Sequence, residues 1–274
     1  MTVATRRELD GLAATREALR ALEERYPWRR AEVDGMLWRW MDTGGAGRPL
    51  ALVPGAVGDG AMFGSTLHSL GERMRLLAVS YPDSADPSAL ASGFAALVRS
   101  QGWQGLALAS SSYGAYWAQC LARNHRTLLG ALLIGNTFTE AADVFDDPAE
   151  QARHLRAATG PQVHAQWLAR VRAAPASPLR DLQEVMLAER QDQDSLRQRL
   201  LGVAQARPLG PMVLSGFPVI TLACADDPLI PERGRLAVER AWPQARHVRL
   251  ERGGHYPSLL APGAYEPLLL EIAQ

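Results

Sequence analysis

The sequence contains no lysine, because all 29 of its basic residues are arginine. A Schiff base to a substrate or to pyridoxal phosphate needs a lysine amine, so this chemistry is excluded. Cysteine is almost as scarce, and Cys120 and Cys224 each lie inside an apolar run. Two such residues indicate small buried hydrophobic side chains and not a disulfide framework or a metal site. We therefore expect no metal and no cofactor.

Long hydrophobic runs and an excess of charge of either sign are also missing. The 29 acidic residues balance the basic ones, which gives a formal net charge of zero and no electrostatic attraction to nucleic acid or anionic lipid. No apolar stretch is long enough to span a bilayer. Polar, arginine-bearing sequence follows Met1, so no signal peptide is expected. We expect a cytoplasmic protein that binds neither nucleic acid nor membrane.

Short apolar segments alternate with helical patterns along most of the 274 residues. The expected strands are 31–33, 36–41, 50–53, 76–81, 105–109, 128–134, 218–223 and 247–250, and the expected helices among them are 63–71, 87–100, 113–124, 231–242 and 264–273. This alternation predicts crossover connections, hence an α/β fold with a mostly parallel eight-stranded sheet and helices on both faces. The turn Asp34-Gly35 joins the first two strands as a hairpin, which supplies antiparallel strands at one edge.

The alternation stops at residues 139–208, which are rich in Ala, Arg, Gln and Leu. Breaks at Pro161, Pro175 and Pro178 divide this stretch into helical pieces. Its place between two predicted strands indicates a helical cap inserted into an α/β core of residues 31–138 and 209–274. This cap would supply a largely apolar wall for the substrate site, formed by Trp167, Leu168, Val171, Met186 and Leu187. For most of these residues the alternative role is ordinary packing onto the core.

The first 30 residues precede the core pattern and predict an amphipathic helix over residues 5–25. The leucines at helical spacing are Leu9, Leu12, Leu19 and Leu22. An apolar stripe of this kind must be covered. The helix either packs on the same domain or mediates a homodimer.

Ser112 is the candidate nucleophile. It follows the predicted strand 105–109 in the segment Ser110-Ser111-Ser112-Tyr113-Gly114, and a predicted helix begins directly after it. A sharp strand-to-helix turn exposes the central serine, and the positions two before and two after it must be small. Ser110 and Gly114 meet this requirement, although glycine usually occupies both positions. The alternative is a serine-rich loop without a catalytic role.

His255 is the candidate base that removes the serine proton. It lies in Gly253-Gly254-His255-Tyr256-Pro257, directly after the last predicted strand, where the glycines allow the chain to turn back over the sheet edge. That is the edge at which Ser112 emerges. The remaining histidines lie in predicted helices or strands and are expected to be structural or solvated: His68, His125, His154, His164 and His247.

Two adjacent aspartates are candidates for the carboxylate that orients the histidine. Asp226 and Asp227 follow the predicted strand 218–223, and the chain order Ser, Asp, His and the spacing to Pro231 favour Asp227. Asp226 stays the alternative. Either aspartate instead caps the helix that begins near Pro231, a role that suits Asp226.

Acyl transfer also needs amide donors for the developing oxyanion. Tyr113, the residue after the serine, supplies one N–H, and Ala56 in the loop after strand 50–53 supplies the other. Gly55 lets substrate approach the backbone closely, and Val57 completes this substrate-binding loop. The loop is rich in glycine but lacks the Lys and Ser/Thr of a phosphate-binding loop and the spacing of a dinucleotide fingerprint.

With these motifs the chain resembles the α/β-hydrolase superfamily over residues 31–274. Within this superfamily it is most similar to maspardin and its bacterial hydrolase relatives. The segments that carry this likeness are Tyr81-Pro82, Ser112-Tyr113-Gly114, Gly135-Asn136-Thr137-Phe138, Trp242-Pro243-Gln244-Ala245-Arg246 and Gly253-Gly254-His255-Tyr256-Pro257. Maspardin is an adaptor-like member without the histidine of the last segment. The resemblance implies an intact Ser112, Asp227 and His255 triad here, and the departures are Pro54-Gly55 in place of His-Gly and Ser110 in place of Gly.

These residues predict a serine hydrolase that cleaves a carboxylic ester or thioester of a small, largely apolar substrate. Epoxide hydrolysis and dehalogenation are disfavoured, because the resemblance associates these activities with members of the fold that have Asp at the position of Ser112. Two alternatives stay open. One is a non-catalytic binding or adaptor protein of the maspardin kind, and the other is a member of the fold that runs cyclisation or acyl transfer instead of hydrolysis.

Overall fold

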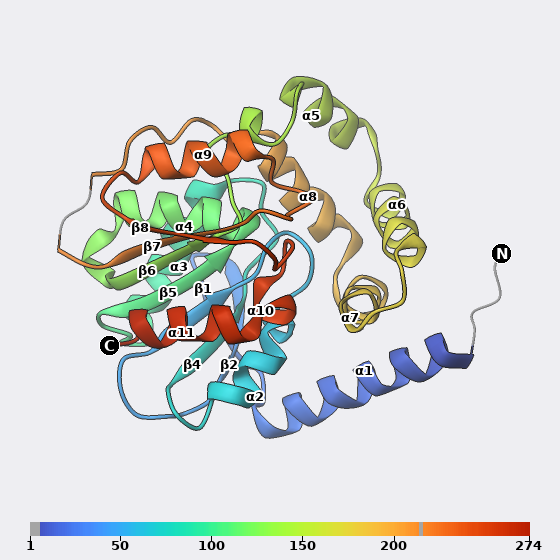
Figure 1. Ribbon diagram of the computed structural model, residues 1–274, viewed down its shortest axis with the longest axis horizontal. Helices are drawn as coiled ribbons and strands as arrows, with labels where there is room; N and C mark the ends of the chain where they lie inside the picture. The colour runs from blue at the N-terminus through green and yellow to red at the C-terminus, as the bar shows by residue number, and fades with distance from the viewer. Residues whose placement is uncertain (1–5, 214–215) are drawn as a thin grey trace.

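The computed structural model describes residues 6–213 and 216–274, with side chains from residue 10 onward. Its centre is one eight-stranded sheet with the strand order β1-β2-β4-β3-β5-β6-β7-β8 (Figure 1). The strands are β1 (Arg29–Val33), β2 (Met36–Asp42), β3 (Leu50–Val53), β4 (Leu76–Ser80), β5 (Leu106–Ser111), β6 (Leu129–Gly135), β7 (Val219–Cys224) and β8 (Arg246–Leu250). β2 is antiparallel to both of its neighbours, β1 and β4, and the other neighbouring strands are parallel, which confirms the predicted mostly parallel sheet with a hairpin at one edge.

The central strands are short apolar runs because both faces of the sheet are covered. All four residues of β3 are buried. Ala51 and Val53 belong to the hydrophobic cluster on one face, and Leu50 and Leu52 belong to the cluster on the other. This division follows the two-residue period of a strand. The pattern that identified the strand thus also fixes its place between two helical layers.

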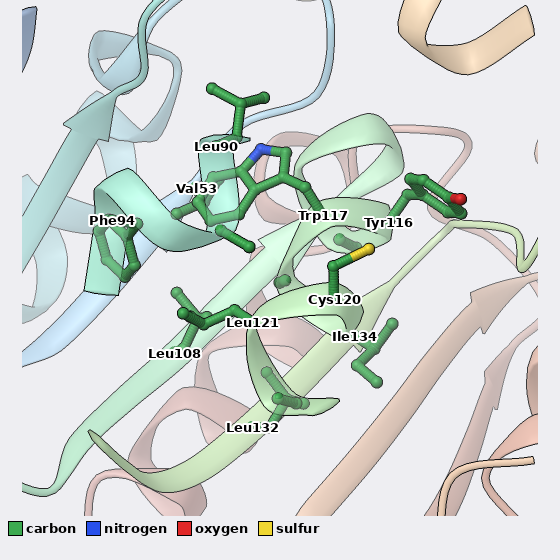
Figure 2. Packing of buried hydrophobic residues seen from close by; sticks show 14 of the residues in the cluster. Val53, Leu90, Phe94, Leu108, Tyr116, Trp117, Cys120, Leu121, Leu132 and Ile134 are labelled. Carbon is green, nitrogen blue, oxygen red and sulfur yellow. The ribbon is translucent and has the colours of Figure 1, made fainter. Parts of the chain in front are cut away.

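Helices cover both faces of the sheet (Figure 1). One layer contains α3 (Pro87–Ser100), α4 (Ser112–Asn124) and α9 (Glu232–Ala241), and the other contains α2 (Gly64–Leu70) and α11 (Pro262–Ile272). Figure 2 shows the first layer, where Trp117 packs against Phe94 with ring centroids 5.5 Å apart and Cys120 lies among apolar side chains. Cys120 and Cys224 are free and buried, as predicted. Burial raises the pKa of each thiol to about 11, which disfavours a reactive thiolate.

The N-terminal helix α1 (Arg6–Arg25) packs on the same domain. Leu12, Leu19 and Leu22 are buried in the cluster that also contains Met62 and Leu67. The apolar stripe is therefore covered by the helix's own domain, which is one of its two predicted roles. Homodimer formation stays a prediction. Residues 1–5 and the side chain of Leu9 lie outside the described residues.

A run of helices separates β6 from β7 and stands beyond one end of the strands (Figure 1). It contains η3 (Ala141–Asp143), α5 (Pro148–Ala157), α6 (Gly160–Ala173), α7 (Pro178–Val185), the π-helical turn η4 (Met186–Arg190) and α8 (Gln193–Ala204). Thr159 and Ser177 cap α6 and α7, whose first turns contain Pro161 and Pro178. These caps and prolines explain why the segment divides where the sequence predicts breaks.

Among the described residues, five short helical elements were not predicted as separate pieces by the sequence pattern. Two of them, η3 and η4, lie in the run between β6 and β7, and the others are η1 (Gly60–Phe63), η2 (Arg126–Leu128) and α10 (Pro257–Leu260). Each has five residues or fewer, which is too short for a hydrophobic period to be recognised. Within the described part of the chain, no helix has the length and apolar character needed to cross a bilayer.

Candidate active site

Ser112 occupies the sharp turn between β5 and α4. The strand ends at Ser111 and the helix begins at Ser112, so no loop residue separates them. Ser112 has a φ of 52°, in the left-handed region that is strained for a residue with a side chain. β5 holds the turn in place because it pairs with β3 on one side and β6 on the other. The hydroxyl is thereby presented to a cavity at the end of the sheet.

Two glycines permit the close packing of this turn. A Cβ on Gly114 would clash with the carbonyl oxygen of Pro54, and a Cβ on Gly55 would lie 2.8 Å from the Cβ of Ser112. The loop after β3 and the turn after β5 therefore approach each other more closely than two side chains allow. This contact brings Ala56 next to the serine turn.

Ser110 replaces the glycine that usually precedes the nucleophile by two positions. Its side chain is buried and its Oγ donates a hydrogen bond to the carbonyl oxygen of Leu133 at 3.2 Å. A buried hydroxyl with a partner carries no large desolvation cost. The departure from the usual motif is thus accommodated inside the sheet, away from the cavity.

His255 and Asp227 form a buried hydrogen-bonded pair. The ring Nδ1 lies 2.8 Å from Asp227 Oδ2, and the two side chains are 7% and 0% exposed. Asp227 Oδ1 accepts hydrogen bonds from the amides of Leu229 and Ile230 at 2.8 and 3.1 Å, so the carboxylate is held on both oxygens. With Nδ1 donating to this carboxylate, Nε2 is the nitrogen left to accept a proton. His255 and Ser112 line the same cavity.

Asp226 has a different role from the one that the sequence suggested. Its carboxylate accepts hydrogen bonds from the amides of Gly253 and Gly254 at 3.2 and 2.8 Å, and these bonds, first that from Gly254, lower its pKa. The next helix along the chain is α9. Its N-cap residue is Pro231, and no side chain forms a capping hydrogen bond there. Asp226 therefore braces the glycine turn that carries His255 and caps no helix.

Asn136 joins the end of β7, which precedes the aspartate, to the loop that carries the histidine. Its Nδ2 donates to the carbonyl oxygen of Gly254 at 2.8 Å, and its Oδ1 accepts from the amide of Cys224 at 2.9 Å. The residue has a φ of 38° at the end of β6, a conformation that asparagine tolerates better than most residues. No role in the site was predicted for Asn136, because its partners lie 88 and 118 positions away.

Two backbone amides are candidates for an oxyanion site. Tyr113 lies in the first turn of α4, where helix amides have no partner within the helix. Ala56 lies in the loop that follows β3, and both Ala56 and Gly55 line the cavity together with Val57. The positive end of the α4 dipole adds to the attraction for a developing negative charge at Ser112.

Side chains from the helical insertion hold the loop that contains Ala56 through hydrogen bonds. Gln191 Nε2 donates to the carbonyl oxygen of Ala56 at 2.7 Å, and Gln191 Oε1 accepts from the amide of Gly58 at 2.9 Å. The buried Arg199 donates to the carbonyl oxygens of Gly58 and Tyr81 at 2.8 and 2.7 Å. No local pattern predicts a role for these two residues, because each bonds to a segment more than 100 positions away.

The cavity has a volume of about 430 Å³ and lies between the sheet edge and the insertion. Of the five residues expected to form its apolar wall, Trp167 lines it. The other four pack inside the protein: Leu168, Val171 and Leu187 in one cluster and Met186 in another. Ordinary packing is therefore the role of most of them, as the alternative interpretation held.

His154 is exposed, which agrees with the expectation of a solvated side chain, but its position was not foreseen. His154 lines the cavity, because it lies on the face of α5 that also presents Gln151 and Leu155. His164 and His247 have structural roles, since their rings bond to the carbonyl oxygen of Leu187 and to Thr221. Within the ranges 6–213 and 216–274, no three or more His, Cys, Asp and Glu residues form a group suited to a metal ion.

Comparison with known proteins gives matches at the level of family and fold. A family model described as "Alpha/beta hydrolase family" matches residues 50–267. Three similar solved structures are a thermophilic esterase from Thermogutta terrifontis with malate bound (20% identity, TM-score 0.71, covering 90% of this chain and 99% of that one), E-2-(acetamidomethylene)succinate hydrolase (16%, 0.68, 90% and 98%), and an epoxide hydrolase from metagenomes of hot environments (14%, 0.70, 91% and 99%). No curated protein matches the sequence. At these identities the structural matches show the α/β-hydrolase fold.

Proposed function

Because the chain belongs to the alpha/beta hydrolase family over residues 50–267, we propose that it is a serine hydrolase that cleaves a carboxylic ester or thioester. The observation that carries this proposal is the arrangement around one cavity. Ser112 sits there on a strained turn, and His255 sits there with its Nδ1 held 2.8 Å from Asp227. A serine, an imidazole and a carboxylate in this relation are the groups that acyl transfer requires.

The proposed reaction has two steps. Ser112 Oγ attacks the carbonyl carbon while His255 Nε2 takes the hydroxyl proton, and the tetrahedral intermediate expels the alcohol or thiol, which leaves with that proton. Water then attacks the acyl-enzyme, His255 again takes a proton, and collapse of the second intermediate returns it to Ser112 and releases the acid. Asp227 orients the imidazole and stabilises its protonated form.

The amides of Ala56 and Tyr113 are the proposed donors to the oxyanion in both steps. Gly55 and Val57 form the wall next to them. Residues 139–208 serve as a cap on a core of residues 31–138 and 209–274, and the cap contributes both the cavity wall and the fastening of the Ala56 loop.

Gln191→Ala is expected to lower kcat by about tenfold to a hundredfold. Without the Gln191 side chain the Ala56 loop can shift, and the displaced Ala56 amide then stabilises the oxyanion less well. Steady-state kinetics with a p-nitrophenyl ester measures the effect. Gln191→Glu keeps the acceptor for the Gly58 amide and loses the donor to Ala56, so its kcat should be intermediate. Gln193→Ala, at an exposed position in the first turn of α8, is the control. Equal kcat values in the two alanine variants would contradict a positioning role for Gln191.

Two other functions fit the site less well. Epoxide hydrolysis is disfavoured by the serine at position 112. A binding or adaptor role, as the resemblance to maspardin suggests, has no need for the buried His255–Asp227 pair. Transfer of the acyl group to an alcohol uses the same residues as hydrolysis, so it is the second candidate.

The proposal is tested by hydrolysis of a series of short p-nitrophenyl esters, with and without added alcohols as competing acceptors. Release of free acid that continues in the presence of the alcohols supports hydrolysis. Product ester in place of acid would identify an acyltransferase. No turnover of any ester, together with no reaction with a fluorophosphonate, would overturn the enzymatic assignment.

A further inference from the structure

The cap helices turn a polar face toward the cavity. Residues of α6 at positions 163, 166, 167 and 170 line it, and residues of α5 at positions 151, 154 and 155 line it too. Both sets have the i, i+3, i+4 spacing of a single helix face. Four of these seven are polar: Gln151, His154, Gln166 and Arg170. A face that served packing alone would be apolar.

The charge on this wall has one sign. Arg170 is the only one of the described cavity-lining residues that belongs to the set Asp, Glu, Lys and Arg. Gln151, Gln166 and His154 can each donate a hydrogen bond as well. The wall therefore offers donors and one positive charge, with no carboxylate to neutralise them.

Arg170 is exposed and has no acidic partner among the described residues. Its guanidinium lies over the ring of Trp167, 5.2 Å from the centroid. Stacking occupies the face of a guanidinium and leaves the N–H groups at its edge free to donate in the plane. Arg172, two residues further along α6, instead pairs with Glu184 at 2.7 Å.

We propose that the substrate carries a carboxylate away from the bond that is cleaved, and that Arg170 binds this carboxylate with help from the neighbouring donors. The inference rests on the proposed esterase function and specifies its substrate class. A guanidinium edge matches a carboxylate in shape and forms paired hydrogen bonds with it. One cation in the wall balances one negative charge, which favours a carboxylate over a phosphate dianion.

The test compares matched pairs of esters that differ in one distal group. On the acyl side the pair is mono-p-nitrophenyl adipate and its methyl ester, and on the alcohol side it is 4-(carboxymethyl)phenyl butyrate and the corresponding carboxamide. Selectivity is the ratio of kcat/KM for the acid to that for its neutral partner. In the wild type this ratio should exceed one for at least one of the two pairs. The pair that shows the selectivity tells whether the substrate carboxylate lies on the acyl side or on the alcohol side of the ester.

Arg170→Gln should lower this selectivity about tenfold, the effect of a lost charge-assisted hydrogen bond, and Arg170→Glu should lower it further. Arg153→Gln is the matched control. It removes one exposed arginine from α5 that does not line the cavity, and its selectivity should stay within twofold of the wild type. Equal selectivity in Arg170→Gln and Arg153→Gln would overturn the inference while leaving the proposed hydrolase intact.

Binding of adipate, measured by calorimetry, separates failure of the inference from failure of the proposed function. If no ester is cleaved, tighter binding of adipate to the wild type than to Arg170→Gln still supports a carboxylate site. Equal binding to both proteins would overturn it. Tighter binding of inorganic phosphate than of adipate at this site would overturn the choice of a carboxylate.

Discussion

Ser112→Ala is expected to lower kcat for ester hydrolysis by at least about 10⁴-fold, because removal of a catalytic serine abolishes the acyl-enzyme route. Alanine has a Cβ like serine, so the strain at φ 52° is unchanged. The thermal unfolding midpoint should therefore stay close to that of the wild type. Initial rates with a p-nitrophenyl ester, after subtraction of spontaneous hydrolysis, measure the effect.

Ser111→Ala is the control for this variant. Ser111 is the preceding residue and also lines the cavity, so its hydroxyl is the alternative nucleophile in the serine triplet. It ends β5 and does not occupy the strained position of the turn. Its removal should change kcat by less than about tenfold. Loss of activity in Ser111→Ala but not in Ser112→Ala would refute the assignment of the nucleophile.

Asp227→Asn is expected to lower kcat by about 10⁴-fold near neutral pH. An amide in place of the carboxylate can present its NH₂ group to His255 Nδ1, which stabilises the tautomer with the proton on Nε2. That histidine cannot accept the serine proton. The loss should appear in kcat/KM measured across a range of pH, and the thermal midpoint reports any change in stability.

Asp226→Asn tests whether the effect belongs to one carboxylate. Asp226 bonds to the amides of Gly253 and Gly254, and an asparagine oxygen can still accept one of these bonds. The expected loss in kcat is below about tenfold, because the effect reaches the reaction only through the position of the turn. The opposite ranking of the two variants would mean that Asp226 is the acid of the triad.

Most of the fold was predictable from the sequence because its strands and longer helices carry their own local signals. β3 is a four-residue apolar run with every side chain buried, and the hairpin has Asp34-Gly35 in the left-handed conformation that its turn requires. The helix breaks in the insertion coincide with prolines and with capping residues. Short-range sequence patterns record such features directly, so they can be recognised without knowledge of tertiary contacts.

The residues around the catalytic groups were less predictable. Gln191 bonds to a loop 133 and 135 positions earlier in the chain, and Asn136 joins the end of β7 to the loop that follows β8. Only the folded chain brings these partners together. Arg170 and His154 were equally hidden, since a polar residue on an amphipathic helix is ordinarily read as exposed to solvent. Both residues are exposed as expected, and only the fold shows that they also line the cavity.

The central claim is that Ser112 is a nucleophile activated by His255, and labelling with a fluorophosphonate tests it most directly. We predict that the wild type is labelled stoichiometrically and that peptide mass spectrometry places the adduct on Ser112. His255→Ala should be labelled far more slowly, and Ser112→Ala should not be labelled. An adduct on another residue, or equal labelling of the wild type and His255→Ala, would contradict the account.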